Sequence, residues 1–257
     1  MRFRLERPAS PAWPATYAAV LASVCEGAAG DRKWPPPPEL LTSLGLSNRT
    51  LVRNRQVHGA TVRVLAAQTS PAELAERPEA DGLLTDRRDL VLAVLVADCA
   101  PVYLVDPVVE VMALVHCGWR GTVADAAAHA LQQMKARYGC RPENLVAWIG
   151  PSISARNYQV GPAVLAEVRR RLSHLPVEQS ILPGERLDIA RLNRDSLLAC
   201  GLPEENIEVS PLCTYEEPDL QSYRRDGDRS GRMFALLWRG ESGTTQVSAD
   251  SKPQSQS

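Results

Sequence analysis

Three side chains far apart in the sequence, His58, Cys99 and His116, each stand in a short polar interruption of an apolar, strand-like segment. Two imidazoles and one thiolate are the ligand set of a catalytic zinc ion that keeps one coordination position open. The same residues also suit a cysteine nucleophile, with Cys99 attacking and His116 as its base. A lone cysteine in an apolar strand can equally be a small buried core residue, so the interpretation depends on the elements that bring the three together.

The segment between Cys99 and His116 predicts a β-hairpin. Apolar residues 102–105 and 111–115 flank the turn signal Asp106-Pro107. In a regular hairpin centred there, Cys99 and His116 lie roughly opposite each other, with Cβ atoms about 5 Å apart. That distance suits two ligands of one metal and also a thiolate–imidazolium pair, while His58 must arrive from another element.

The residues beside this trio supply candidate substrate contacts. Gly118-Trp119-Arg120-Gly121-Thr122 follows His116 and precedes a helix predicted from about 122 to 138. Exposed N–H groups at a helix start and the guanidinium of Arg120 favour an anion, so we predict that Arg120, Gly121 and Thr122 bind phosphate. The alternative is a glycine turn required for close packing.

Two further residues carry predicted roles in the chemistry. Arg224, in the basic cluster 222–228, is a candidate phosphate clamp, although the cluster also fits a solvated hairpin loop. Asp98 precedes Cys99 directly and is a candidate for moving protons or for orienting a ligand. With Cys99 and His116, it completes the predicted catalytic set.

Composition excludes several classes of protein. The 257 residues are 44% hydrophobic and 23% charged, with a formal net charge of −1, which is ordinary for a soluble globular protein. That charge predicts neither nucleic acid nor an anionic membrane as partner. Six cysteines without a CxxC pair favour reduced thiols, and neither a secretory signal nor a membrane-spanning run is recognisable. We therefore expect a cytoplasmic protein, and the sequence leaves its oligomeric state open.

Apolar patterning predicts a layered fold. The runs from 90 to 116 are continuously apolar, which is typical of a sheet covered on both faces. Helices are predicted at 16–25, 70–76, 122–138, 163–173 and 187–200, and strands within 50–66 and at 145–149, 207–209 and 233–238. Strict βαβ alternation is absent, so we predict an α+β fold, a layered α/β sandwich with mixed sheets covered by outer helices. Residues 1–240 would form one domain, weakly patterned over 1–45, and the polar residues 241–257 a disordered tail.

Six motifs in order resemble one known family: NRQVHGATV, EADGLLTD, VADCAPVYLVDP, VHCGWRGTVADA, WIGPSI and SYRRDGDRSGRMFALLWR. Together, from about residue 50 to 240, they look like the laccase-domain family, also called multicopper polyphenol oxidase-like and now described as purine nucleoside phosphorylases. The resemblance implies a layered α/β fold and one Zn²⁺ held by His58, Cys99 and His116. It also implies a nucleoside and phosphate as small-molecule partners, with phosphorolysis of adenosine, inosine, guanosine and methylthioadenosine, and deamination of adenosine.

The sequence departs from the family pattern in places. Cys117 stands where the family motif HAGWRGT has alanine, and residues 154–158 lack the family's usual glycine and cysteine. The laccase label itself fits poorly, because a blue-copper oxidase needs many histidines and several copper sites, whereas this chain has four histidines.

Two other functions use the same residues. Cys99 and His116 would make a hydrolase or amidase that acts on peptidoglycan precursors, an activity that the family resemblance allows. A catalytically silent binding protein with a retained zinc site is the remaining alternative.

Overall fold

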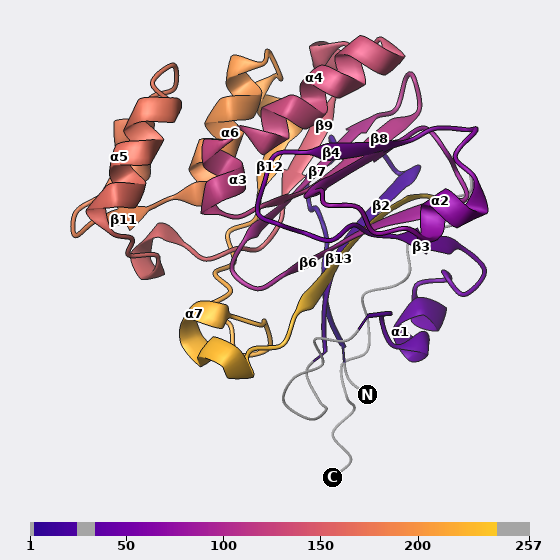
Figure 1. The fold of residues 1–257 in the computed structure, drawn as a ribbon, viewed down its shortest axis with the longest axis horizontal. Helices are drawn as coiled ribbons and strands as arrows, with labels where there is room; N and C mark the ends of the chain where they lie inside the picture. The colour runs from indigo at the N-terminus through magenta and orange to yellow at the C-terminus, as the bar shows by residue number, and fades with distance from the viewer. Residues whose placement is uncertain (1–2, 25–33, 241–257) are drawn as a thin grey trace.

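The computed structural model describes residues 3–24 and 34–240, and within them two β-sheets pack face to face with helices outside (Figure 1). The five-stranded sheet has the order β1-β2-β13-β6-β3 and consists of β1 (Phe3–Glu6), β2 (Tyr17–Val24), β3 (Thr50–Val52), β6 (Leu90–Val96) and β13 (Met233–Arg239). The six-stranded sheet has the order β12-β9-β7-β8-β5-β4 and consists of β4 (Val62–Leu65), β5 (Gly82–Thr85), β7 (Ala100–Asp106), β8 (Val111–Cys117), β9 (Val146–Ile149) and β12 (Ile207–Val209). β10 (Ile181–Leu182) and β11 (Arg186–Leu187) form a separate pair.

The helices of the described residues are α1 (Pro38–Ser43), α2 (Pro71–Ala75), α3 (Trp119–Val123), α4 (Ala126–Tyr138), α5 (Pro162–Arg171), α6 (Ile189–Ala199) and α7 (Tyr223–Asp226). Short 3₁₀ turns lie at Pro142–Asn144, Ala155–Asn157, Val177–Ser180, Glu204–Asn206 and Gly227–Arg229. None of the helices in the described part of the chain combines the length and apolar character needed to cross a bilayer.

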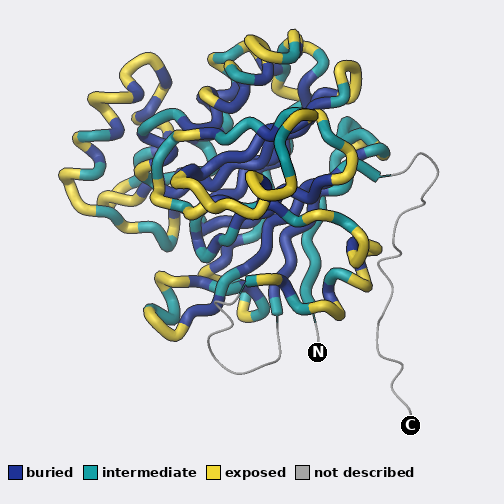
Figure 2. The backbone as a smooth tube through the Cα atoms, turned by 45° about the vertical axis from the view of Figure 1, so that its right-hand side comes forward, coloured by how far each residue is buried: buried dark blue, intermediate teal, exposed yellow. Residues whose placement is uncertain are grey.

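Three apolar cores separate the layers. Side chains from both sheets, such as Leu92, Tyr103 and Trp148, fill the space between them. Helices α4, α5 and α6 cover the outer face of the six-stranded sheet, and α1 covers the outer face of the other sheet. The strands therefore form a buried centre, and the exposed residues gather on helices and loops (Figure 2). Parallel and antiparallel pairs occur in both sheets, which confirms the predicted sandwich of mixed sheets.

The helix predicted over 16–25 is wrong, because Tyr17–Val24 is strand β2. It pairs with β1 on one side and β13 on the other, and nearly all of its residues are buried. A short apolar run buried on both faces has no periodicity that separates a strand from a helix. Pairing on both edges outweighs the weak helix preference of its alanines. The predicted tail, 241–257, lies outside the described residues.

The single helix predicted over 122–138 is also wrong, because the segment contains two helices. α3 ends at Val123 and α4 begins at Ala126, with Asp125 between them in the left-handed region at φ 59°. The Asp125 carboxylate accepts a hydrogen bond from the Ser196 hydroxyl of α6 and so does not cap α4. The chain therefore turns sharply between the two helices, and α3 is a separate element directly after the His116 strand.

The β7–β8 hairpin exists as predicted, but its register differs by two residues. Pro101 lies opposite His116, and the last ladder pair is Ala100 with Cys117. The turn takes four residues, because Asp106 Oδ1 accepts hydrogen bonds from the N–H groups of two turn residues, and Glu110 adopts φ 63°. Cys99 therefore stands just beyond the end of the ladder and not directly opposite His116.

The segment that carries His58 crosses from one sheet to the other. β3 pairs with β6 in the five-stranded sheet, whereas β4 pairs with β5 in the six-stranded sheet. The strands predicted on either side of the His58 turn are confirmed, but they belong to different layers. This crossing brings the His58 turn to the open end of the β7–β8 hairpin, where Ala100 pairs with Cys117.

Candidate metal centre

His58, Cys99 and His116 converge, although Cys99 stands 41 positions after His58 in the sequence. One ligand atom of each lies within 4.8 Å of the others, and among the described residues no other group of three or more such side chains could hold a metal ion. The two imidazole rings meet edge to face, with centroids 4.9 Å apart. His116 is buried, Cys99 is half-buried and His58 is exposed, so the centre is open to solvent on the His58 side.

Asp81 fixes the orientation of His116. Its carboxylate is fully buried, and Oδ1 lies 2.9 Å from His116 Nδ1. A hydrogen bond from Nδ1 leaves Nε2 as the nitrogen that faces Cys99 and a metal ion. Histidine ligands commonly have such a carboxylate partner, which sets the ring orientation and raises the basicity of the ligand nitrogen.

The same carboxylate also holds the His58 turn. It accepts hydrogen bonds from three consecutive N–H groups, at 3.1 Å from Val57, 2.9 Å from His58 and 2.7 Å from Gly59. His58 adopts φ 60°, which costs a non-glycine residue about 1–2 kcal/mol. The three charge-assisted hydrogen bonds offset this strain. One buried carboxylate therefore positions two of the three candidate ligands.

Sequence analysis missed the role of Asp81. The available signal was an aspartate beside a continuously apolar segment, in EADGLLTD, because a carboxylate buried there requires several hydrogen-bond donors.

The glycines after His116 provide space for the centre. A Cβ on Gly118 would lie 2.9 Å from Cys99 Sγ and 3.0 Å from His58 Cδ2. A Cβ on Gly121 would lie 3.0 Å from the Gly59 carbonyl oxygen. Both glycines are therefore explained by close packing, the alternative to an anion-binding turn.

Thr122 faces the protein interior. Its hydroxyl accepts a hydrogen bond from Asn193 Nδ2, and its N–H donates to the Gly118 carbonyl. The residue is buried, so its described contacts fasten α3 to α6. Of the residues predicted to bind phosphate around this turn, Arg120 is the one exposed to solvent.

The charges of the trio stabilise one another. Burial opposes ionisation of the Cys99 thiol, but the neighbouring His116 and hydrogen bonds with both histidines lower its pKa to about 6. Burial likewise disfavours protonation of His116, but Cys99 and Asp81 raise its pKa to about 9. Burial raises the pKa of Asp81, and the hydrogen bonds from His116 and the turn outweigh it, so the net shift is downward. The two shifts have opposite directions, and both favour a thiolate beside an imidazolium.

Asp98 is held by donors on both carboxylate oxygens. Oδ1 accepts from the Thr214 hydroxyl and Oδ2 from the Arg224 N–H, each at 2.6 Å. The residue is buried and adopts φ 81°. Its described contacts orient the chain directly before Cys99.

Arg120 in α3 and Arg224 in α7 each lie against an aromatic ring. The guanidinium of Arg224 lies 5.1 Å from the centroid of the Tyr158 ring, and that of Arg120 lies 4.5 Å from that of Trp119. The pKa of Tyr158 rises to about 12, chiefly through burial and the nearby Cys99, against the opposing charges of both arginines. Tyr158 therefore lies within electrostatic range of Cys99 and of both arginines.

The donor set fits a single metal ion. Three ligand atoms lie close together, a carboxylate orients one imidazole, and no side chain at position 118 fills the space between Cys99 and His58. Fold and site define a two-sheet sandwich protein with a solvent-open His₂Cys centre that could bind a metal ion. The chain belongs to the family described as multi-copper polyphenol oxidoreductase laccase, whose model matches residues 38–240.

Relatives carry names from nucleoside metabolism. Purine nucleoside phosphorylase YlmD of Bacillus subtilis is 37% identical over 164 residues, which are 61% of this chain and 58% of that protein, so the match spans little more than half of the relative. The Geobacillus stearothermophilus protein of the same name is 37% identical over 198 residues, 74% of this chain and 72% of the relative. The crystal structure of YlmD from that organism superposes with a TM-score of 0.81 at 29% identity, over 92% of this chain and 96% of that one. Adenosine deaminase RL5, from an unknown prokaryotic organism, is 32% identical over 208 residues, 78% of this chain and 79% of the relative.

Replacing Asp81 should weaken metal binding. Four donors, three backbone N–H groups and His116 Nδ1, converge on the Asp81 carboxylate. In Asp81→Asn one carboxylate oxygen is replaced by an NH₂ group, which donates hydrogen bonds and cannot accept them. The His58 turn and His116 therefore lose their common acceptor. We expect Zn²⁺ affinity to fall by about 10- to 100-fold, measured by competition with a chromophoric chelator. Asp86→Asn, at an exposed residue just after the same strand, is the matched control. Unchanged affinity in folded Asp81→Asn protein would contradict the assignment.

The thiols should differ in their pH dependence. The thiolate is the reactive form, so in metal-free protein the alkylation of Cys99 should rise as pH increases through about 6 and then level off. Burial and the adjacent Asp106 raise the pKa of Cys140 to about 12, so that thiol should stay unreactive up to about pH 9. Iodoacetamide rates at each cysteine, followed by mass spectrometry, measure both. A Cys99 rate that still climbs steeply above pH 8, like that of an ordinary thiol, would refute the predicted ion pair.

Proposed function

We propose that this protein is a zinc-dependent purine nucleoside phosphorylase that accepts adenosine, inosine, guanosine and methylthioadenosine and also deaminates adenosine. The convergence of His58, Cys99 and His116 into one ligand group is the observation that carries the proposal. The printed names of the relatives, purine nucleoside phosphorylase and adenosine deaminase, supply the reaction classes.

Zinc is the metal that the donor chemistry favours. His58, Cys99 and His116 would hold Zn²⁺ in the three-ligand arrangement of catalytic sites, which leaves one position for water or substrate. Bound zinc supplies Lewis-acid activation of an oxygen at that position. His129 lies in α4 and His174 near Asp125, so both remaining histidines stand apart from the centre. This distribution favours one mononuclear site over a set of coppers.

Arg120 and Arg224 would bind the phosphate co-substrate. Phosphorolysis breaks the C–N glycosidic bond, joins a phosphate oxygen to the ribose carbon, and returns the electron pair of the bond to the purine. The guanidinium of Arg224 lies over Tyr158 and that of Arg120 over Trp119, and both charges act to lower the pKa of the Tyr158 hydroxyl against the larger effect of burial. Two such guanidinium groups can neutralise the phosphate and hold it with forked hydrogen bonds. The aromatic stacking of each arginine keeps its head group in place.

Asp98 has a positioning role in this proposal. Its two oxygens already accept hydrogen bonds from Thr214 and Arg224, so a proton shuttle would first have to release one of them. Orienting Cys99 and Arg224 requires no such release.

The cell compartment we propose is the cytoplasm. Cys99, Cys117, Cys140, Cys200 and Cys213 are free thiols, which suits a reducing environment. The proposed partners are a nucleoside and phosphate, with neither nucleic acid nor membrane involved.

A second candidate function rests on the paired charges of Cys99 and His116. A thiolate beside an imidazolium is the resting state of many cysteine nucleophiles. Such a hydrolase or amidase needs no metal, so activity on peptidoglycan precursors should survive chelation. Metal binding without turnover on either substrate class would instead identify a silent binding protein.

One experiment tests the proposal. Purified protein of known zinc content is incubated with adenosine, with and without phosphate, and adenine, ribose 1-phosphate and inosine are quantified. We expect adenine and ribose 1-phosphate only with phosphate, inosine that accumulates without phosphate and is partly consumed with it, and loss of all products after chelation.

Cys99→Ala should lose bound zinc and should lower kcat/KM by about 10²-fold or more, because metal activation is worth several kcal/mol. Cys117→Ala is the matched control, since Cys117 is the next buried cysteine, packs in the core on the helix side and does not belong to the ligand group. Normal zinc content and full turnover in Cys99→Ala would overturn the proposal.

A further inference from the structure

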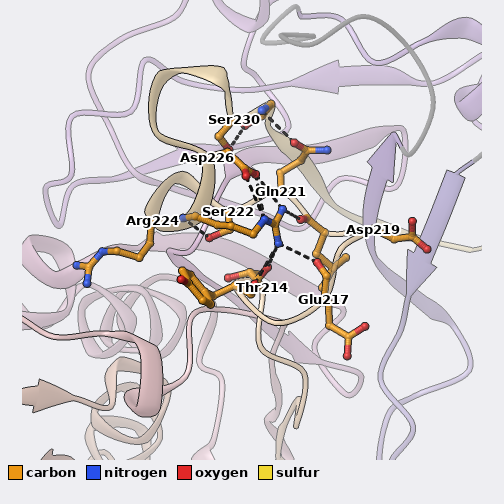
Figure 3. A network of polar contacts seen from close by, with 12 residues as sticks. Thr214, Glu217, Asp219, Gln221, Ser222, Arg224, Asp226 and Ser230 are labelled. Carbon is orange, nitrogen blue, oxygen red and sulfur yellow. Dashed lines mark hydrogen bonds and ion pairs between the residues drawn. The ribbon is translucent and has the colours of Figure 1, made fainter.

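The guanidinium of Arg225 is the centre of a polar network that includes Thr214, Glu217 and Asp226, which are labelled in Figure 3. It donates hydrogen bonds to four backbone carbonyls, at 3.0 Å to Thr214, 3.2 Å to Tyr215, 3.1 Å to Glu217 and 2.8 Å to Leu220. It also pairs with the Asp226 carboxylate at 2.9 Å. The side chain thus supplies these carbonyls with the hydrogen bonds that a neighbouring strand supplies within a sheet.

This network joins a loop and a helix into one unit. Residues 214–226, here called the arm, consist of the loop from Thr214 and helix α7. The Ser222 hydroxyl accepts the Arg225 N–H at the start of α7. Leu220 anchors the arm in the core between the sheets, whereas Tyr215 and Tyr223 are exposed. With so little apolar anchoring, polar contacts shape the arm. Those of Arg225 tie its own residues together, and Arg4 with Glu217 and the Ser23 hydroxyl with the Asp219 carbonyl tether it to the sheet.

The arm donates a hydrogen bond to each carboxylate oxygen of Asp98. Thr214, at one end of the arm, donates its hydroxyl to Oδ1, and Arg224, near the other end, donates its N–H to Oδ2. The Asp98 carbonyl accepts from the Ile153 N–H at 3.0 Å, and the residue is held at φ 81°. Because Cys99 is the next residue, the path of the chain into this ligand depends on where the arm holds Asp98.

The arm also places Arg224. The side chain of Arg224 points away from the network (Figure 3), and its Nη1 lies 3.0 Å from the Gln159 carbonyl, with the guanidinium over Tyr158. The side chains of these two consecutive residues of α7 therefore point in different directions and make different contacts. Arg225 faces inward and fastens the arm, and Arg224 reaches outward to the proposed phosphate position.

We propose that Arg225 is a positioning residue that sets Cys99 through Asp98 and sets Arg224 through α7. The effect of Arg225 on phosphate binding rests on the proposed function, whereas its effect on the position of Cys99 does not. A lysine at this position keeps the charge but has one ammonium group, which cannot reach four carbonyls in the fork geometry of arginine.

The test compares Arg225→Lys, Asp98→Asn and the double variant as full-length zinc-loaded proteins. Each single variant should speed zinc transfer to a chromophoric chelator by about tenfold, the range seen when groups that orient ligands are lost. The double variant should be no faster than the faster single variant, because both changes break one path and residues in one network are not additive. Arg225→Lys should also raise the KM for phosphate and leave the KM for the nucleoside unchanged.

Arg229→Lys is the matched control, an exposed arginine just beyond α7, and should match the wild type in every measurement. Thermal unfolding verifies that each variant is folded.

A purely structural Arg225 would lower the melting temperature and leave zinc release and the phosphate KM unchanged, and that result overturns the proposal. Additive effects of the two substitutions on zinc release, or a wild-type chain that holds no metal, would also overturn it. A wild type that binds zinc but turns over no nucleoside refutes the proposed function alone, and zinc release then still decides the role of Arg225.

Discussion

The buried carboxylate of Asp81 is the interaction on which the centre depends. It receives three consecutive backbone N–H groups and the Nδ1 of His116, so its hydrogen-bonding capacity is nearly saturated. A carboxylate in this position would be costly without those donors, and the turn would be strained without the carboxylate. Each therefore requires the other, and together they fix the backbone of the His58 turn and the imidazole of His116.

The third ligand is positioned by different means. Cys99 stands beyond the end of the β7–β8 ladder, where strand pairing no longer fixes the chain. Asp98, held by Thr214 and Arg224 of the arm, supplies that constraint, and Gly118 leaves room for the sulfur. Two supports, the Asp81 carboxylate and the contacts of Asp98, therefore meet at the open end of the β7–β8 hairpin in the middle of the six-stranded sheet. This arrangement explains why so many polar contacts gather around three ligand atoms.

Sequence reasoning predicted the layered fold and the ligand trio, because buried strands and rare residue types leave strong local signals. The motifs added the family and its expected residues. Sequence reasoning failed where pairing with distant strands decides the secondary structure, as at Tyr17–Val24, whose apolar run fits a helix or a strand equally well. It also missed Asp81 and Arg225, because their importance comes from backbone groups of distant segments, which no local pattern records. The two-residue register difference in the hairpin has the same origin, since the Asx turn at Asp106 adds residues that spacing alone does not reveal.

X-ray absorption at the zinc edge of the purified full-length protein tests the central claim most directly. One zinc per chain, with one sulfur and two imidazole nitrogens among its ligands, is the result expected if Cys99, His58 and His116 share a single ion. A zinc environment without sulfur, or one with several sulfur ligands, would contradict the account.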